Sequence, residues 1–267
     1  QTGPCSRSGA DISAGDMERI YLDNAATSWP KPDCVYEAVD SYQRQCGAPA
    51  GRSSYDEALQ ADSAIGRARS NVAKLIGAES PERVVFAFNG TDALNMALHG
   101  WLNHAGPKPV GVITSVAEHN SALRPLRALA NRGLVQPVYV PCDSEGVVDV
   151  AAIRSAIDKN TAMIALTHAS NVTGVLQPAA EVGKLAREHG ILFLLDAAQS
   201  LGDVPIDVQQ LQVDLLAAPG HKGLLGPLGT GVLYLRPGCE GKLQPLRQGG
   251  TGSQSEQEEQ PTRLPDR

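Results

Sequence analysis

The chain has 267 residues, of which 42% are apolar, so it can bury a sizeable core as one large domain or two smaller ones. Its formal net charge of -6, with no long basic cluster, argues against a nucleic-acid partner. An apolar run such as residues 191–195 is far shorter than the roughly 20 residues of a membrane-spanning helix, and the N-terminus lacks the apolar stretch of a secretory signal. We therefore expect no membrane partner.

The N-terminal third is predicted to be irregular and then helical. Residues 1–18 are small and polar, and we expect them to be disordered. Residues 19–22 are predicted as a short strand and residues 23–32 as a loop. An amphipathic helix is expected over residues 34–44, and apolar residues at helical spacing then predict a longer helix that stops at Gly77.

From residue 83 onward, short apolar segments alternate with segments of helical spacing. This alternation is typical of an α/β fold, in which helices cover both faces of a mostly parallel sheet. The expected strands are 83–88, 109–115, 134–141, 161–168, 191–196, 213–218 and 230–237, and the expected helices are 92–102, 121–132, 150–157 and 179–190.

The five cysteines are scattered, with no CxxC pair and an odd count: Cys5, Cys34, Cys46, Cys142 and Cys239. This pattern indicates neither a disulfide framework nor a metal site, and a reducing cytoplasm is the simplest setting for it. Each thiol is interpreted as a buried or incidental side chain.

Polar residues follow successive expected strands: Thr91, His119, His168 with Asn171, and Asp196. Because ligands collect at the carboxyl ends of parallel strands, these positions predict one site.

The chemistry of that site is indicated first by Asp196 and Lys222. Asp196 ends an apolar strand, and Lys222 follows Gly220 and His221 in a segment too rich in glycine for a regular helix or strand. A carboxylate can keep the pyridine nitrogen of pyridoxal 5'-phosphate (PLP) protonated, and a lysine can hold its aldehyde as an imine. Either residue alone is weak evidence for PLP, since an aspartate after a strand is often only part of a turn.

The segment Asn89-Gly90-Thr91-Asp92 lies between a strand and a helix, where free N–H groups and a hydroxyl can hold a phosphate. Alternatively, Thr91 or Asp92 is only a helix N-cap. His119 can lie on a flat cofactor ring, or it is a loop histidine without that role.

Three further residues can complete the set. Asn171 and Gln199 can each donate to the phenolic oxygen of the cofactor, although asparagine is also common in turns. His221 can reach the phosphate, although adjacent residues in a strand would point in opposite directions.

Seven segments together resemble the class V aminotransferase family of fold-type I PLP enzymes. They are YLDNAATSWPKP, NGTDALNMAL, EHNSALRP, THASNVTGVLQP, LLDAAQSLGDVPIDV, PGHKGLLGPLGTGVLYL and GGTGSQSE. The sequence most closely resembles cysteine desulfurases and selenocysteine lyases, over nearly everything after residue 18. The resemblance implies a transferase or lyase of sulfur metabolism that forms a homodimer. It also implies an amino-acid substrate such as cysteine or selenocysteine, and a sulfur-acceptor protein as a partner.

The resemblance also implies a role for individual residues. Lys222 would hold PLP and move protons on the substrate, Asp196 would face the pyridine nitrogen, and His119 would stack on the ring. Asn171 and Gln199 would contact the phenolic oxygen of the cofactor. The phosphate would be held by Gly90, Thr91, Asp92 and His221, and Thr251 would reach the phosphate bound by the other subunit. Asn24 and Ala25 would line the substrate side.

Two features depart from the family pattern. Pro219 stands where a serine often donates to the phosphate. Family members also continue into a small domain that carries a nucleophilic cysteine and an arginine for the substrate carboxylate, whereas this sequence stops at Arg267. We therefore expect a fold-type I large domain over residues 19–250, and a loop over 251–267 that leads to a missing C-terminal small domain.

The sequence thus predicts a PLP-dependent cysteine desulfurase-like protein that forms alanine and an enzyme persulfide in its complete form. One alternative is an aminotransferase or lyase acting on another amino acid. The other is a catalytically inactive fragment that still binds PLP.

Overall fold

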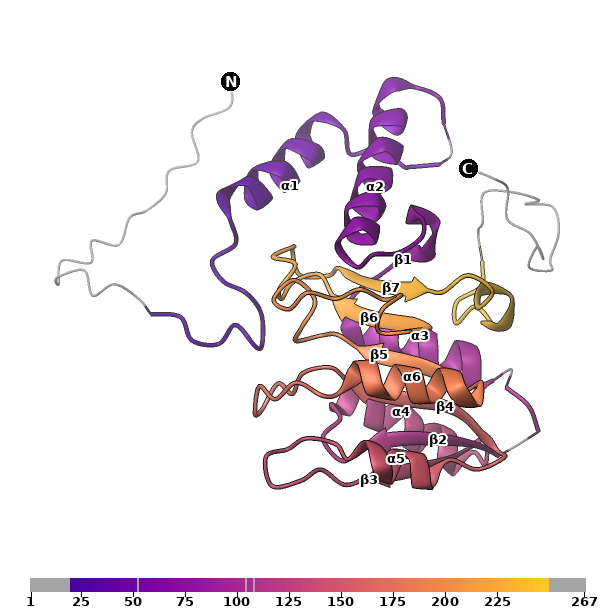
Figure 1. Cartoon of the computed structure of the whole chain (residues 1–267). Helices are drawn as coiled ribbons and strands as arrows, with labels where there is room; N and C mark the ends of the chain where they lie inside the picture. The colour runs from indigo at the N-terminus through magenta and orange to yellow at the C-terminus, as the bar shows by residue number, and fades with distance from the viewer. Residues whose placement is uncertain (1–19, 52, 104, 108, 250–267) are drawn as a thin grey trace, which may run out of the picture.

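The computed structural model describes residues 20–249, except Arg52, His104 and Lys108. These residues build a sheet with helices on both faces and two helices that extend beyond the edge formed by β1 (Figure 1). The helices are α1 (Asp33–Gln45), α2 (Asp56–Leu75), α3 (Gly90–Leu102), α4 (Asn120–Asn131), α5 (Val150–Ala156) and α6 (Ala179–His189), with short 3-10 turns η1 (Pro81–Arg83) and η2 (Glu240–Lys242). The strands are β1 (Val84–Ala87), β2 (Val110–Ser115), β3 (Val135–Val140), β4 (Thr161–Thr167), β5 (Leu192–Asp196), β6 (Leu215–Pro219) and β7 (Gly231–Leu235).

In the described part of the chain, the sheet has seven strands in the order β1-β7-β6-β5-β4-β2-β3. Strands β3, β2, β4, β5 and β6 pair in parallel. Strand β7 is antiparallel to both of its neighbours, β6 and β1, so β1 runs in the same direction as the parallel set. The carboxyl ends of these six strands therefore meet at one edge, where α/β proteins bind ligands.

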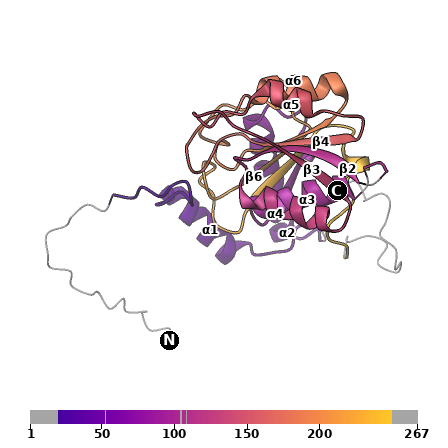
Figure 2. The ribbon, with the colours of Figure 1, turned by 90° about the horizontal axis from the view of Figure 1, so that it is seen from below.

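The sheet separates two apolar cores. Successive residues of a strand point to opposite faces, so Leu194 packs into the core with α3 and α4 whereas Leu195 packs into the core with α5 and α6. Figure 2 shows α5 and α6 on one side of the strands and α3 and α4 on the other. Because both faces are covered, β5 is apolar without alternation.

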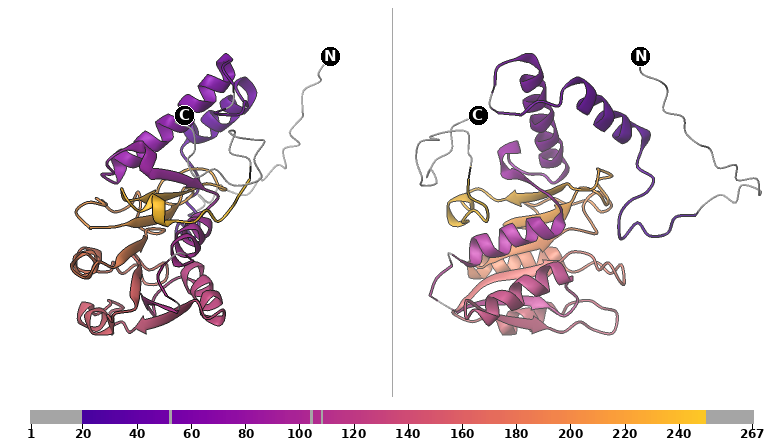
Figure 3. Two further views of the ribbon diagram at one scale, coloured as in Figure 1. Left: turned by 90° about the vertical axis from the view of Figure 1, so that its right-hand side faces the viewer. Right: turned by 180° about the vertical axis from the view of Figure 1, so that it is seen from behind.

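The two N-terminal helices stand apart from this layered body (Figure 3). Helix α2 reaches the core at its C-terminal end, where Ala73 is buried together with Ile76, the residue after the helix. Helix α1 buries none of its residues, and its apolar side chains Tyr36, Val39 and Tyr42 are exposed. The apolar face that its sequence periodicity predicts therefore has no packing partner among the described residues.

The structure confirms the predicted helices, the strands from residue 83 onward, and the mostly parallel α/β fold. The strand predicted over residues 19–22 is wrong, because residues 20–22 pair with no strand, and Ile20 and Leu22 are 78% and 89% exposed. The predicted disorder of residues 1–18 and the loop of 251–267 lie outside the described residues. Among the helices that are described, none is long and apolar enough to cross a membrane.

Candidate active site

Lys222 lies in the irregular segment between β6 and β7, at the edge where the parallel strands end. Backbone hydrogen bonds shape this segment. Among them, the Leu225 N–H donates to the Lys222 carbonyl at 2.8 Å, and the Gly226 N–H donates to the Gly220 carbonyl at 2.7 Å. Glycine is required at position 220 because a Cβ there would overlap the hydroxyl of Thr230. The glycines thus serve close packing, and the half-buried Lys222 lies on a fixed turn.

Asp196 ends β5 with its side chain buried, at 3% exposure. The Ala198 N–H donates to Asp196 Oδ1 at 2.9 Å. Burial raises the pKa of Asp196, and the nearby His119 and Lys222 act in the opposite direction. Burial also lowers the pKa of the Lys222 amine, against the influence of Asp196. The structure therefore brings these three residues into one electrostatic environment.

His168 supports the strand end that carries Asp196. Its backbone N–H donates to the Asp196 carbonyl at 2.8 Å, and its Nδ1 lies 2.9 Å from Ser200 Oγ. Burial lowers the pKa of His168, which favours the neutral imidazole. Sequence reasoning noted the position of His168 but gave it no role, and it missed Ser200 because a serine in a turn carries no specific signal.

His119 is the N-cap residue of α4, and the first turn of that helix orients its ring. The backbone N–H of Ser121 donates to His119 Nδ1 at 3.1 Å, and Ser121 Oγ lies 2.7 Å from the same nitrogen. Because Nδ1 accepts a hydrogen bond, the neutral imidazole carries its proton on Nε2. The backbone therefore sets both the direction and the tautomer of this ring.

Helix α3 follows β1 closely, and its N-cap is Asn89. The Asp92 N–H donates to Asn89 Oδ1 at 2.8 Å, and the Phe88 N–H donates to Asp92 Oδ2 at 2.9 Å, a reciprocal pattern like a capping box. The alternative that Thr91 or Asp92 is the N-cap is therefore wrong. Gly90 and Thr91 form the first turn, whose N–H groups have no acceptor within the helix and can bind an anion.

Asp92 also connects α3 to the segment after η2. Arg247 forms an ion pair with the Asp92 carboxylate, and its guanidinium lies 4.8 Å from the ring centroid of Phe88. Burial favours the protonated acid, but the hydrogen bonds from Arg247 and from the Phe88 N–H outweigh it and lower the pKa of Asp92. In the structure the charged Asp92 carboxylate thus binds Arg247 and the Phe88 N–H. Its predicted contact with a cofactor stays a prediction.

The loop of residues 23–32 is tied to the segment that carries Lys222. Thr27 Oγ1 donates to the His221 carbonyl at 3.0 Å, and Ser28 Oγ donates to the Lys222 carbonyl at 3.0 Å. Lys31 Nζ donates to the His221 carbonyl at 2.7 Å. Burial and the two lysines lower the pKa of His221, whose Nδ1 lies 3.0 Å from Thr27 Oγ1. Sequence reasoning missed these contacts, because hydroxyl residues in a loop are too common to mark them.

Asn24 and Ala25 belong to the same loop. Gln199 Nε2 donates to the Ala25 carbonyl at 2.9 Å, so the loop also reaches the turn after β5. Asn24 Oδ1 accepts a hydrogen bond from the Trp29 N–H at 3.4 Å, which is a contact within the loop. The structure thus places Ala25 beside Gln199, which lies in the turn after β5.

Two predicted residues are not placed against the others. Asn171 lies exposed in the turn after β4, and no hydrogen bond joins its side chain to the other described site residues. Thr251 lies outside the described residues. Their predicted roles therefore stay predictions.

The described cysteines are Cys34, which is exposed, Cys46 and Cys142, which are half-buried, and Cys239, which is 2% exposed. Burial raises the pKa of the Cys142 and Cys239 thiols, and a raised pKa disfavours the reactive thiolate. Within the described ranges, no group of histidine, cysteine and carboxylate side chains is arranged to hold a metal ion.

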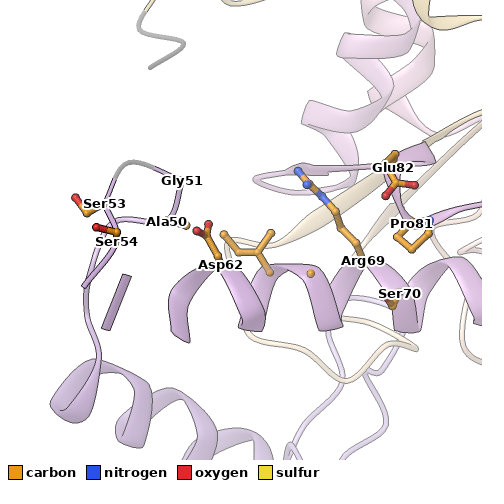
Figure 4. Close-up of a pocket in the computed structure, with 11 residues that line it drawn as sticks. Ala50, Gly51, Ser53, Ser54, Asp62, Arg69, Ser70, Pro81 and Glu82 are labelled. Atoms are coloured by element: carbon orange, nitrogen blue, oxygen red, sulfur yellow. The ribbon is translucent and has the colours of Figure 1, made fainter. Parts of the chain in front are cut away.

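Two cavities bear on where a ligand could bind. One of about 430 Å³ includes Thr91 and His119 in its lining, so it joins the start of α3 to the start of α4. Another, of about 970 Å³, lies between α2, η1 and the loop before α2, and Figure 4 shows Asp62 and Arg69 extending from α2 beside it. Neither Asp196 nor Lys222 lines either cavity, and the smaller one alone includes predicted site residues in its lining.

The profile of the aminotransferase class-V family matches residues 20–266. A probable cysteine desulfurase of Methanothermobacter thermautotrophicus is 39% identical over 233 residues, which are 87% of this chain and 57% of that protein. Cysteine desulfurase IscS of Dictyoglomus turgidum is also 39% identical, with the same shares of both chains. The chain therefore spans a little more than half the length of these relatives.

Solved structures show the same similarity. The apo structure of cysteine desulfurase from Thermococcus onnurineus NA1 matches with a TM-score of 0.82 and 35% identity, over 87% of this chain and 57% of that one. The structure of SspA in complex with cysteine matches with a TM-score of 0.80 and 33% identity, over 86% of this chain and 65% of that one.

Proposed function

This chain belongs to the class-V aminotransferase family, whose members are PLP-dependent enzymes, and on that premise we propose that the full-length protein is a cysteine desulfurase. In this reaction the C–S bond of cysteine breaks, the sulfur passes to a protein thiol as a persulfide, and alanine leaves. The observation that carries the proposal is the buried Asp196 carboxylate at the end of β5 in the electrostatic environment of Lys222 and His119. The desulfurase relatives and the cysteine complex of SspA favour cysteine as the substrate.

The residues at this edge of the sheet fit PLP. A cofactor with a protonated ring nitrogen would offset the burial cost of the Asp196 charge, which the protein itself offsets only in part. The first turn of α3 offers backbone N–H groups to a phosphate, and Lys222 offers an amine to an aldehyde. When bound, PLP supplies an electron-accepting ring that stabilises negative charge at the substrate Cα.

Lys222 is suited to both covalent attachment and proton transfer. Burial lowers the pKa of its amine, so a larger fraction is neutral near pH 7 than for an exposed lysine. A neutral amine is a nucleophile for a carbonyl carbon and a base for the proton on a substrate Cα. The ties from Thr27 and Ser28 hold the backbone of this segment in place.

The other predicted residues would orient the cofactor and shield it from water. His119, whose ring is fixed by Ser121, would lie on the cofactor ring and exclude water from that side. Gly90 and Thr91 would hold the phosphate at the start of α3, with His221 as a further contact. Gln199 and Asn171 would donate to the phenolic oxygen, and Asn24 and Ala25 would line the substrate side.

The thiol that accepts the sulfur must ionise, because the thiolate is the nucleophile. Burial raises the pKa of Cys239 and of Cys142, and none of the four described cysteines lines the cavity that includes His119. We therefore propose that the accepting thiol is none of the four cysteines in the described part of the chain.

Several properties follow from the family and belong to the same proposal. The protein would be a cytoplasmic homodimer in which Thr251 reaches the phosphate of the partner subunit, and a sulfur-acceptor protein would remove the persulfide sulfur. A second candidate is an aminotransferase or lyase acting on another amino acid, since the described residues fit PLP without selecting a substrate.

The test uses the full-length protein loaded with PLP and supplied with cysteine and an excess of a reducing thiol, which releases the persulfide sulfur as sulfide. Alanine and sulfide are the measured products. We expect equal amounts of both products, and a loss of at least about 100-fold in Lys222→Ala, since positioned acid–base catalysis contributes about 10²–10⁴-fold. Lys184→Ala, which changes an exposed lysine of α6, is the matched control.

The outcomes separate the candidate functions. Formation of a keto acid from cysteine or alanine, without sulfide, when a second keto acid is supplied to accept the amino group, would support an aminotransferase instead. Turnover of another amino acid in the absence of cysteine turnover would support a different lyase. PLP binding without any turnover would support an inactive binding protein.

A further inference from the structure

Glu118 lies directly before His119 in the loop between β2 and α4, and its side chain is buried, at 7% exposure. Ser115 Oγ, at the end of β2, donates to Glu118 Oε1 at 2.7 Å. The Ala117 N–H donates to Ser115 Oγ at 3.2 Å, so one hydroxyl joins both ends of the turn. Glu118 Oε2 is buried and has no hydrogen-bond partner among the described residues.

The surroundings of Glu118 disfavour a negative charge. The titratable groups that face it are Asp196 from β5 and Cys142 from the segment after β3, and neither is a cation. Burial raises the pKa of Glu118 to about 8, Asp196 adds to this effect, and the hydroxyl of Ser115 and the N–H of Thr167 oppose it. A buried carboxyl group without a cationic partner costs less free energy when it is protonated.

We propose that Glu118 is an uncharged positioning residue that ties the β2–α4 loop to Ser115 and so fixes the imidazole of His119. The neutral acid keeps the acceptor that Ser115 uses and adds an O–H donor at Oε2. With Glu118 neutral, Asp196 is the group that supplies the negative charge beside the proposed cofactor ring. The role of His119 at that ring rests on the proposed function, but the protonation of Glu118 does not.

The first experiment measures the Tm of the PLP-free full-length protein between pH 5 and pH 8. The pKa of Glu118 is higher in the folded chain than its usual value of 4.5, so the unfolded chain loses this proton first as the pH rises. The contribution of Glu118 to stability therefore falls across this range, and Glu118→Gln removes that fall. We expect the Tm of Glu118→Gln to rise relative to wild type with increasing pH.

Glu181→Gln, at an exposed glutamate of α6, is the matched control and should stay parallel to wild type. A constant difference in Tm between Glu118→Gln and wild type would mean that the folded and unfolded chains bind the same number of protons at Glu118, so that Glu118 is charged in the folded chain. That result would overturn the proposal. This experiment needs no cofactor, so it decides whether Glu118 is uncharged even if the protein does not bind PLP.

The second experiment measures the circular dichroism of bound PLP, which reports how the protein holds the cofactor ring. We expect Glu118→Gln to keep the wild-type signal, and Glu118→Ala and Ser115→Ala to reduce it, because both lose the bond that fixes the loop. If Glu118→Ala does not fold, Ser115→Ala alone tests the tie. A signal in Glu118→Gln that is reduced as much as in Ser115→Ala, or a wild-type signal in Ser115→Ala, would overturn the positioning role.

Discussion

The charge on Asp196 is the residue-level feature on which the site depends. In the apo protein burial opposes this charge, and a bound cation would favour it. Asp196→Asn keeps the size of the side chain but removes the charge. Because hydrogen bonds to charged groups contribute roughly 1.5–3 kcal/mol, we expect kcat to fall by about 10- to 100-fold in the full-length enzyme while PLP occupancy changes little. Steady-state kinetics and the absorbance of bound PLP measure these effects.

The exposed Asp40→Asn of α1 is the matched control for this substitution. Unchanged turnover in Asp196→Asn would show that the carboxylate does not support the ring nitrogen.

Lys222 should show the influence of Asp196 directly. Burial lowers the pKa of its amine, and Asp196 partly restores it. Removing that carboxylate takes away the restoring effect, so Asp196→Asn should lower the pKa of Lys222 further. The measurement is the pH dependence of reductive methylation of Lys222 in the PLP-free full-length protein, read by mass spectrometry. A shift to higher pH in the variant would contradict the coupling between these two side chains.

The start of α3 is the element on which the proposed phosphate contact depends. Asn89 accepts the Asp92 N–H, and loss of such a cap costs about 1 kcal/mol in the free energy of unfolding. We expect Asn89→Ala to lower the Tm by a few degrees and also to weaken PLP binding, since the same turn presents the N–H groups to the phosphate. Thermal unfolding and PLP titration check both effects.

Asn131→Ala, at the exposed end of α4, is the control for Asn89→Ala. If Asn89→Ala lowers the Tm but leaves PLP affinity unchanged, the phosphate is held elsewhere.

The whole molecule is proposed to be a homodimer with sites that two chains share. We expect the full-length protein with PLP to sediment as a dimer. Thr251→Ala should weaken PLP binding by about 3- to 10-fold, the value of one neutral hydrogen bond, without dissociating the dimer. Thr173→Ala, in the exposed turn after β4, is the control. A PLP-bound monomer of unchanged affinity in sedimentation and titration experiments would contradict this assembly.

The sequence by itself determined the features that depend on local pattern. Short apolar runs between segments of helical spacing predicted the α/β sheet, because strand and helix periodicities are properties of neighbouring residues. Asp196 at a strand end and Lys222 among glycines likewise indicated a PLP site, which stays a prediction. Residues 20–22 have a strand-like composition as well, but a strand also needs a partner to pair with, and they have none among the described residues.

Only the tertiary structure decided how these local features meet. It placed β7 antiparallel between β1 and β6, tied Thr27 and Ser28 to the segment of Lys222, and buried Glu118 near Asp196. The contact of Thr27 with His221 joins residues 194 positions apart. No local pattern predicts such a contact, because it depends on which surfaces pack together once the sheet has formed, and burial then sets the charge of each side chain.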